Sequence, residues 1–180
     1  MGTLFLRIYF GKELKNGKVA FALIGCGRIS KNHIMAAAQN QEICELAAVC
    51  DPVLERAEQK AADYFEQTGK KTKIYADYRE MLQKEEIDCC AIATESGYHA
   101  EIALYCIGQG KHVLIEKPMA LSTADAEKMI KEAKERGVTL GVCHQHRFNA
   151  PIQHLKKAVD DGRFGKLLNG TARILWNRTM

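Results

Sequence analysis

A glycine-rich turn near the start of the sequence has the residue types that bind a phosphate group. Residues 25–30 read Gly-Cys-Gly-Arg-Ile-Ser, between an apolar run and an expected helix. Gly25 permits a tight turn, and Gly27 has no side chain, so a pyrophosphate can approach the backbone there. The small Ser30 allows the helix to pack closely on the strand. The N-terminus of that helix presents N–H groups and a partial positive charge to the phosphate oxygens.

An acidic residue follows this turn at the distance expected for a dinucleotide site. Asp51 lies at the end of the second apolar run, about 20 residues after the turn. Its carboxylate can accept hydrogen bonds from the ribose hydroxyls of an adenosine, and it would repel a 2′-phosphate. The spacing therefore favours NAD over NADP as a cofactor. A glycine turn without a ligand is the alternative, because a Gly-x-Gly pattern alone is a weak signal.

Short apolar runs alternate with helical patterns along the chain. The runs cover residues 19–24, 43–50, 87–93, 112–115 and 138–143. Each has the length and composition of a strand buried on both faces. Apolar residues at helical spacing fill gaps between the runs: Leu54, Ala57, Ala61 and Phe65; Ala100, Ala103, Leu104 and Ile107; Ala126, Met129, Ile130 and Ala133. The alternation predicts an α/β fold, a Rossmann doubly wound parallel sheet whose helices turn these apolar stripes toward the core.

Composition excludes several classes of protein. The 180 residues are 47% hydrophobic and 27% charged, as in an ordinary soluble globular domain. The net charge of +4 comes from basic residues scattered among acidic ones, which argues against a nucleic-acid surface. No apolar run approaches the ~20 residues of a membrane span. The seven cysteines form no Cys-x-x-Cys pair, so we expect buried free thiols and a reducing, cytoplasmic location.

The pattern divides the chain into three parts. Residues 1–18 form an N-terminal extension, residues 19–148 the NAD-binding Rossmann domain, and residues 149–180 the start of a truncated second α/β domain. In the last part we expect a helix with Ile152, Leu155 and Val159 on one face, followed by a long strand over 166–178 that contains Trp176. That strand has no expected partner in this chain.

Two motifs carry a resemblance to a known family. Residues 110–118 read Gly-Lys-His-Val-Leu-Ile-Glu-Lys-Pro, and residues 25–33 read Gly-Cys-Gly-Arg-Ile-Ser-Lys-Asn-His. The loop from Thr94 to His99 and the segment 144–149 are similar to further parts of the same pattern. Over residues 19–178 the sequence resembles the Gfo/Idh/MocA family of nicotinamide-dependent sugar oxidoreductases.

The resemblance implies roles for individual residues. Lys117 would take the substrate's hydroxyl proton or polarise the hydroxyl oxygen, whereas Glu116 would orient the nicotinamide end of NAD. A solvated Lys117, or one that only pairs with Glu116, is the alternative. The cofactor-binding residues implied are Gly25, Cys26, Gly27, Arg28, Ile29, Asp51, Thr94, Glu95, Ser96, His99, Glu116 and Gln145. The substrate-binding residues implied are Lys117, Arg147 and Asn149, with Arg147 available to a carboxylate or a diphosphate.

The loop that begins at Thr94 narrows the expected substrate. Residues 94–96 read Thr-Glu-Ser, unlike the family's commoner Thr-Pro-Asn. They resemble the subgroup that oxidises the 3-hydroxyl of UDP-N-acetylglucosaminuronate in the biosynthesis of surface polysaccharides. The resemblance thus implies an NAD-dependent oxidoreductase acting on CH–OH groups, with a nucleotide sugar as its small-molecule partner and a homo-oligomeric full-length state. A dehydrogenase of a free sugar or inositol is one alternative, and a non-catalytic NAD-binding fragment is another.

Two further expectations concern histidines and the end of the chain. His144 and His146 alternate on the last apolar segment and would share one face, but no third ligand accompanies them, so we predict no metal site. His33 either packs the helix or faces the site. The family's aspartate and histidine of the second domain do not occur before Met180. The chain on its own is therefore expected to be inactive.

Overall fold

The computed structural model describes residues 17–175. Contacts divide the chain into two compact units, the first ending at Cys143 and the second beginning at His144. The expected extension before residue 17 and the expected strand residues from Trp176 onward lie outside the described residues.

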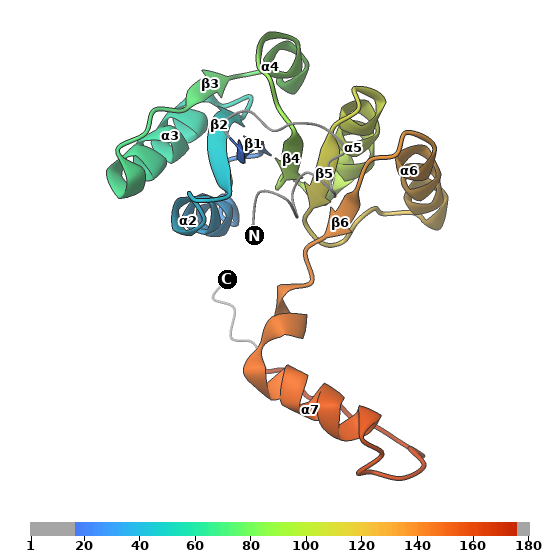
Figure 1. Ribbon diagram of the computed structural model, residues 1–180. Helices are drawn as coiled ribbons and strands as arrows, with labels where there is room; N and C mark the ends of the chain where they lie inside the picture. Colours follow the sequence, from blue (N-terminus) through green and yellow to red (C-terminus); the bar gives the residue numbers. More distant parts are fainter. Residues whose placement is uncertain (1–16, 176–180) are drawn as a thin grey trace. The chain divides into compact units, whose positions relative to one another are not determined.

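A six-stranded parallel sheet forms the centre of the first unit (Figure 1). Its strands lie in the order β3-β2-β1-β4-β5-β6, and each neighbouring pair is parallel. Strand order therefore reverses between β1 and β4, as in a Rossmann fold, which confirms the predicted fold class. The strands are β1 (Val19–Ile24), β2 (Cys44–Cys50), β3 (Lys73–Tyr75), β4 (Cys89–Ile92), β5 (His112–Ile115) and β6 (Leu140–Val142).

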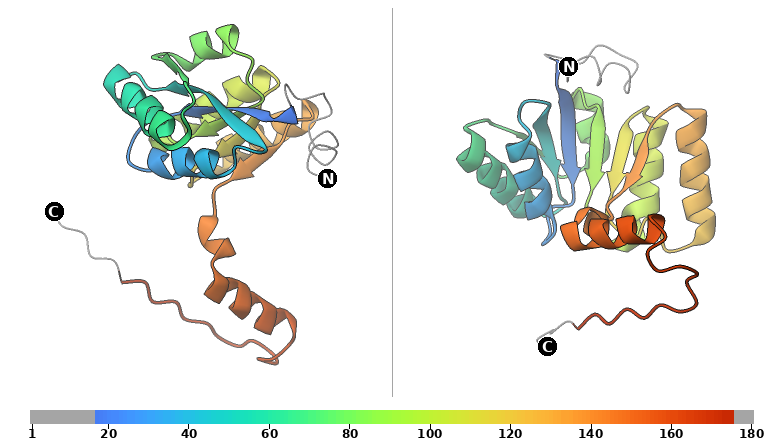
Figure 2. Two further views of the ribbon diagram at one scale, coloured as in Figure 1. Left: turned by 60° about the vertical axis from the view of Figure 1, so that its left-hand side comes forward. Right: turned by 60° about the horizontal axis from the view of Figure 1, so that its bottom comes forward.

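Helices cover both faces of this sheet, as right-handed crossovers require. On one face α2 (Ser30–Gln39) and α3 (Leu54–Thr68) lie side by side (Figure 2) and pack Ile34 and Tyr64 into one apolar cluster. The other face carries three helices, which contribute Met81, Ile107 and Met129 to a second cluster. These helices are α4 (Tyr78–Lys84), α5 (His99–Gly108) and α6 (Thr123–Glu135).

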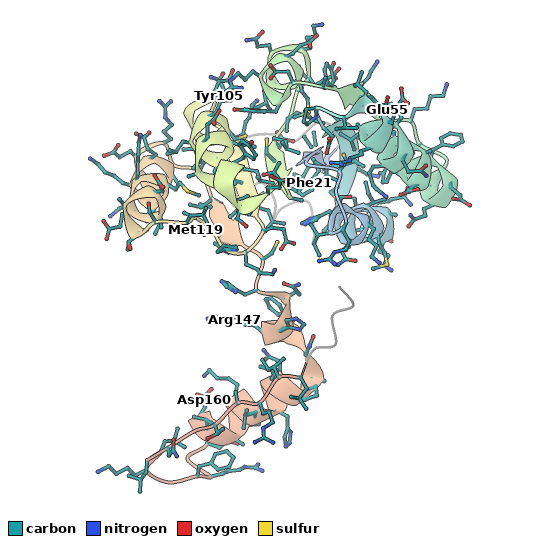
Figure 3. All side chains as sticks on the ribbon, turned by 180° about the vertical axis from the view of Figure 1, so that it is seen from behind. Phe21, Glu55, Tyr105, Met119, Arg147 and Asp160 are labelled. Carbon is teal, nitrogen blue, oxygen red and sulfur yellow. The ribbon has the colours of Figure 1, made fainter. Side chains whose placement is uncertain are left out.

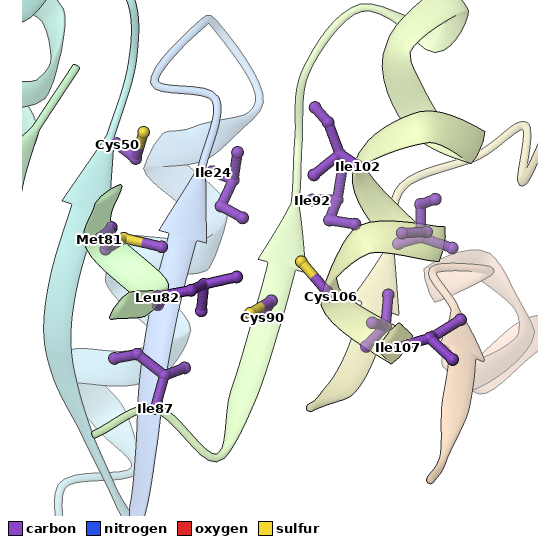
Figure 4. Close-up of a cluster of buried hydrophobic side chains, with 14 of the residues drawn as sticks. Ile24, Cys50, Met81, Leu82, Ile87, Cys90, Ile92, Ile102, Cys106 and Ile107 are labelled. Atoms are coloured by element: carbon purple, nitrogen blue, oxygen red, sulfur yellow. The ribbon is translucent and has the colours of Figure 1, made fainter. Parts of the chain in front are cut away.

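The cysteines behave as small apolar residues. Cys50, Cys90 and Cys106 lie among isoleucines in the second cluster (Figure 4), and all seven cysteines are unpaired. Burial raises the pKa of both Cys26 and Cys50 to about 12. These thiols are therefore protonated and unreactive near neutral pH, as the sequence predicts.

The helical stripes are narrower than expected. Phe65 and Ile130 are 49% and 55% exposed, although the spacing placed both on core-facing stripes. Tyr64 and Met129, one position earlier in each helix, are the fully buried residues. A helix lying on a sheet buries a limited strip of its surface, so residues at the margin of an apolar stripe remain in solvent.

β3 and α4 are not among the elements predicted from the sequence. Only three residues form β3, at the edge of the sheet, and Lys73 and Ile74 are exposed there, so no buried apolar run marks the strand. Seven residues form α4, and Asp77 caps it by accepting a 2.6 Å hydrogen bond from the Arg79 N–H. That aspartate was the available signal, because such residues are preferred before a first helical turn.

The second unit contains a short 3₁₀ helix, η3 (Gln145–Phe148), and one α-helix, α7 (Ala150–Asp160), which confirms the expected helix. The strand expected over 166–178 is wrong for residues 166–175, which adopt neither helix nor strand. The described residues of the second unit include no strand with which this segment could pair, and a lone strand is not stable in water. His144 and His146 also do not alternate on a strand, because His144 precedes η3 and His146 lies within it.

The described residues contain no helix with the length and apolar character needed to cross a membrane.

Candidate functional site

The first glycine of the turn is held in a conformation and a space that only glycine fits. Gly25 follows β1 with a φ of +95°, and its N–H donates a 2.8 Å hydrogen bond to the Cys50 carbonyl. A Cβ at Gly25 would lie 2.6 Å from the carbonyl carbon of Ala93 and from the amide nitrogen of Thr94. The carboxyl ends of β1 and β4 therefore approach each other through this glycine.

Open space and free donors surround the second glycine. A Cβ at Gly27 would meet no atom within 4 Å. No described residue accepts a hydrogen bond from the N–H groups of Gly27, Arg28 or Ile29. Ser30 is fully buried, and its hydroxyl donates to the Gly27 carbonyl at 2.5 Å, which closes the turn onto α2.

The N-terminus of α2 also retains its positive partial charge. No side chain caps this helix, and its first turn has no acidic residue. The four helices that follow in the first unit, α3 to α6, each carry an acidic residue in the first turn: Glu55, Glu80, Glu101 and Asp125. Free N–H groups and an uncompensated helix dipole together form a site for an anion such as a pyrophosphate.

A cleft of about 1080 Å³ opens at this turn, where the carboxyl ends of β1, β2 and β4 meet. This is the point at which strand order reverses, where doubly wound sheets bind their ligands. Eight of the predicted cofactor residues line the cleft: Gly25, Cys26, Gly27, Arg28, Ile29, Asp51, Thr94 and Glu95. Ser96 begins the 3₁₀ helix η2 (Ser96–Tyr98) just beyond them and is not among the lining residues.

Asp51 holds the turn as well as facing the cleft. One carboxylate oxygen accepts from the Cys26 N–H at 2.8 Å, and the other accepts from the Val53 N–H at 2.9 Å. The side chain is 5% exposed. Each oxygen keeps a second lone pair, so the carboxylate can still accept from a ribose hydroxyl. Its negative charge is thus fixed at one end of the cleft.

The cleft has a second wall that the sequence analysis missed. Arg56, Tyr78 and Arg79 line it, the last two from the short helix α4. The Arg79 guanidinium lies 4.5 Å from the ring centroid of Tyr78, and it pairs with Glu101 at 2.6 Å. Burial raises the pKa of Tyr78 to about 12, so its hydroxyl stays protonated. These planar groups offer a surface on which a flat heterocycle can stack.

Glu116 and Lys117 directly follow β5, and the first side chain is buried whereas the second is exposed. Glu116 is 7% exposed, and its Oε1 lies 3.1 Å from His33 Nε2. The Lys117 main-chain N–H donates to Glu116 Oε2 at 3.4 Å, whereas its side chain is exposed. Within residues 17–175 no carboxylate pairs with the Lys117 ammonium, which argues against a simple ion pair with Glu116. Neither residue lines the cleft of the turn. The Lys117–Pro118 peptide bond is cis.

His99 begins α5 and does not line the cleft of the turn. It is 1% exposed, and its ring nitrogens lie 2.8 Å from the Pro118 carbonyl oxygen and 3.2 Å from the Thr94 carbonyl oxygen. A neutral imidazole donates through one ring nitrogen only, so the ring donates to one of these carbonyls and lies close to the other. His99 thus connects the loop after β4 to the loop that carries Lys117, and its role toward the cofactor stays a prediction.

Replacing His99 by leucine is expected to lower the free energy of unfolding by about 2 kcal/mol, because this buried ring no longer hydrogen-bonds the loop carbonyls of Thr94 and Pro118. Urea denaturation followed by circular dichroism measures the loss. The matched control is His154→Leu, since His154 is exposed on α7, and it should change stability by less than about 0.5 kcal/mol. Equal effects of the two substitutions would contradict this role for His99.

The remaining predicted residues belong to the second unit. Gln145 and Arg147 lie on η3, and Asn149 follows it; all three are exposed, and Figure 3 shows Arg147 on this short helix. Asn149 Nδ2 lies 3.2 Å from His146 Nδ1. Their roles toward cofactor and substrate stay predictions.

The parallel sheet, the glycine turn and the acidic residue after β2 define a dinucleotide-binding Rossmann domain. The family model of the Gfo/Idh/MocA oxidoreductases, whose description is an NAD-binding Rossmann fold, matches residues 19–144. This chain therefore belongs to that family, and the matched residues form its NAD-binding domain.

Three relatives show the range of activities around this domain. The solved WlbA dehydrogenase of Bordetella pertussis, in complex with NADH and UDP-GlcNAcA, is 40% identical with a TM-score of 0.73, over 82% of this chain and 43% of that one. Myo-inositol 2-dehydrogenase of Thermotoga maritima is 31% identical over 80% of this chain and 41% of its own length. D-glucoside 3-dehydrogenase of Escherichia coli is 30% identical over 86% of this chain and 42% of its own. The chain thus spans less than half the length of these relatives.

Proposed function

We propose that this chain is the NAD-binding part of a dehydrogenase that oxidises the 3-hydroxyl of UDP-N-acetylglucosaminuronate. The observation that carries the proposal is the cleft at the strand reversal, which is lined by Asp51 and by three N–H groups that no described residue accepts from. The sugar assignment is supported by the 40% identity to a dehydrogenase solved with NADH and UDP-GlcNAcA. It is also supported by the Thr-Glu-Ser sequence at residues 94–96.

Each part of the cleft fits a part of the cofactor. The N–H groups of residues 27–29 would hold the pyrophosphate, and Asp51 would accept from the adenosine ribose. Tyr78 and Arg79 offer the stacking surface for the adenine. When bound, NAD supplies the hydride acceptor. The protein's own contribution to this end of the site is to bind and orient.

Proton transfer falls to residues at the end of β5. The exposed ammonium group of Lys117 has no carboxylate partner among the described residues, so it is available to the substrate hydroxyl. Glu116 is buried and bonded to His33 and to the Lys117 main chain, which fixes the backbone that carries the lysine. We assign Lys117 the transfer or polarisation of the hydroxyl proton, and Glu116 the orientation of the nicotinamide end.

The second unit belongs to the same proposal. Residues 149–180 would begin a substrate domain. Arg147, just before this domain, and Asn149, at its start, would contact the uronate carboxylate or the diphosphate. The full-length protein would be a cytoplasmic homo-oligomer. Seven unpaired cysteines support a reducing compartment.

A second candidate function is the oxidation of a free inositol. It is favoured by the 31% identity to the Thermotoga maritima enzyme over 144 residues. A substrate panel with NAD decides between the two, measured on the chain together with whatever follows it in its reading frame. NADH formed from UDP-N-acetylglucosaminuronate at a kcat/KM at least tenfold above that for myo-inositol supports the proposal, and the reverse order overturns it. The 180-residue chain alone should bind NAD and show no turnover of either substrate.

Asp51→Asn is expected to reverse or narrow the preference for NAD over NADP. The substitution removes the negative charge that opposes a 2′-phosphate, while Arg28 and Arg56 still line the same cleft. NAD affinity should fall a few-fold, because the amide keeps only one acceptor oxygen for the ribose and for the Cys26 N–H. Calorimetric titration of both cofactors into wild type and variant measures the ratio of dissociation constants. Wild-type protein that binds NADP as tightly as NAD would contradict the assignment of Asp51.

A further inference from the structure

Three potential metal ligands lie close together at the carboxyl ends of β5 and β6, and none of them lines the cleft of the glycine turn. His33 comes from α2, Glu116 follows β5, and Cys143 follows β6. Their ligand atoms all lie within 4.8 Å of one another. The three residues are far apart in the sequence, so no ligand spacing along the chain marks them.

In the structure, a hydrogen bond joins two of these three side chains. His33 Nε2 lies 3.1 Å from Glu116 Oε1, and both side chains are about nine-tenths buried, at 10% and 9% exposure. The Cys143 Sγ lies within 4.8 Å of the ligand atoms of both residues. The carboxylate therefore faces an imidazole and a thiol, and a cation can replace a proton on either group.

We propose that His33, Glu116 and Cys143 bind a thiophilic divalent cation, with Zn²⁺ as the representative ion. An imidazole nitrogen, a carboxylate oxygen and a thiolate sulfur are the donors that zinc takes in proteins. Three protein ligands leave the fourth tetrahedral position for water. Nitrogen and oxygen ligands at about 2.0–2.1 Å from zinc stand about 3.3 Å apart in a tetrahedron, and the 3.1 Å between His33 and Glu116 is close to this separation.

Charge and proton balance favour a divalent ion in this partly buried place. On binding, the Cys143 S–H bond breaks, the Sγ–metal bond forms and the proton leaves to solvent. His33 binds through the lone pair of one ring nitrogen while the other nitrogen carries the N–H, so a proton shared between Nε2 and Glu116 moves to Nδ1 when Nε2 is the ligand. One thiolate and one carboxylate then neutralise the two positive charges of the ion, which limits the cost of burying it. Binding should tighten as pH rises, because a proton is lost.

The test uses the 180-residue chain without NAD, so that it does not depend on the proposed function. Co²⁺ replaces zinc as the spectroscopic probe, because a thiolate ligand gives a near-ultraviolet sulfur-to-cobalt absorption. Equilibrium dialysis against Zn²⁺ gives the stoichiometry. The variants are Cys143→Ser and His33→Ala, with Cys44→Ser and His154→Ala as matched controls: Cys44 is a half-buried thiol whose Sγ donates to the Asn40 carbonyl, and His154 is exposed on α7.

We expect one Co²⁺ per chain, with the charge-transfer band absent from Cys143→Ser and the affinity at least ~10-fold weaker in His33→Ala. Both controls should bind as the wild type does. Circular dichroism checks that the variants are folded; if Cys143→Ser is not, Glu116→Gln, which keeps the shape of the side chain, must show the same loss of affinity. A protein with no charge-transfer band, or a band that persists in Cys143→Ser and disappears in Cys44→Ser, overturns the site.

Discussion

Lys117→Met in the proposed full-length dehydrogenase is expected to lower turnover by about 100-fold or more, with the dissociation constant of NAD changed by no more than a few-fold. The reason lies in the separation of the two regions of the domain. The lysine side chain is exposed at the end of β5, whereas the free N–H groups and Asp51 line a cleft that does not include it. Initial rates at saturating cofactor and substrate, with a separate NAD titration, measure the two effects independently.

Lys117→Arg separates two explanations of that loss. Arginine keeps the positive charge but does not release its proton near neutral pH. If Lys117 takes the hydroxyl proton, the arginine variant should be nearly as slow as the methionine variant; if the lysine only polarises the oxygen, arginine should restore part of the rate. Lys128→Met is the matched control, because Lys128 is exposed on α6. Near-normal turnover of Lys117→Met at saturation would exclude both explanations.

The parts of the site that the sequence predicts are those whose chemistry lies in one short segment. The glycine turn combines its strand, its two glycines, Ser30 and the start of α2 within about a dozen residues, and backbone geometry alone constrains each of them. Asp51 is found by its distance from this turn, because the length of one βαβ unit is nearly constant. The sheet follows from its buried apolar runs, except for β3, which is too short and too exposed to form one.

The parts that the sequence does not predict depend on contacts between distant segments. Arg79 reaches the cleft only because α4 follows the unrecognised β3. His99 looks like a residue of the cofactor loop, yet its ring is buried between two backbone carbonyls that lie 5 and 19 positions away. Helical periodicity also does not tell which edge of an apolar stripe the sheet covers. Phe65, for example, lies on the predicted stripe of α3 but is about half exposed. In each case the packing partner, which no local pattern encodes, determines the result.

The two glycines of the turn provide a contrast within three residues, and Gly25→Ala is expected to reduce the free energy of unfolding by about 3 kcal/mol. Its new methyl group would lie 2.6 Å from backbone atoms of Ala93 and Thr94, and its φ of +95° is unfavourable for alanine. Overpacking of this kind typically costs about 1–3 kcal/mol, and the left-handed backbone adds about 1–2 kcal/mol. Because the neighbouring atoms are backbone atoms of β4 and its loop, no side chain can move aside to relieve the contact.

Gly27→Ala should leave stability within about 0.5 kcal/mol of the wild type, because its methyl group would meet no atom within 4 Å and its φ is not in the left-handed region. The same empty space is where a pyrophosphate would approach the backbone, so the dissociation constant of NAD should rise at least ~10-fold. Urea denaturation without cofactor, and calorimetric titration of NAD into the folded protein, measure the two quantities. A Gly27→Ala protein that is stable and binds NAD as tightly as the wild type would show that the phosphates do not lie against this turn. A loss of stability equal to that of Gly25→Ala would instead show that the space at Gly27 is needed by the fold and not by a ligand.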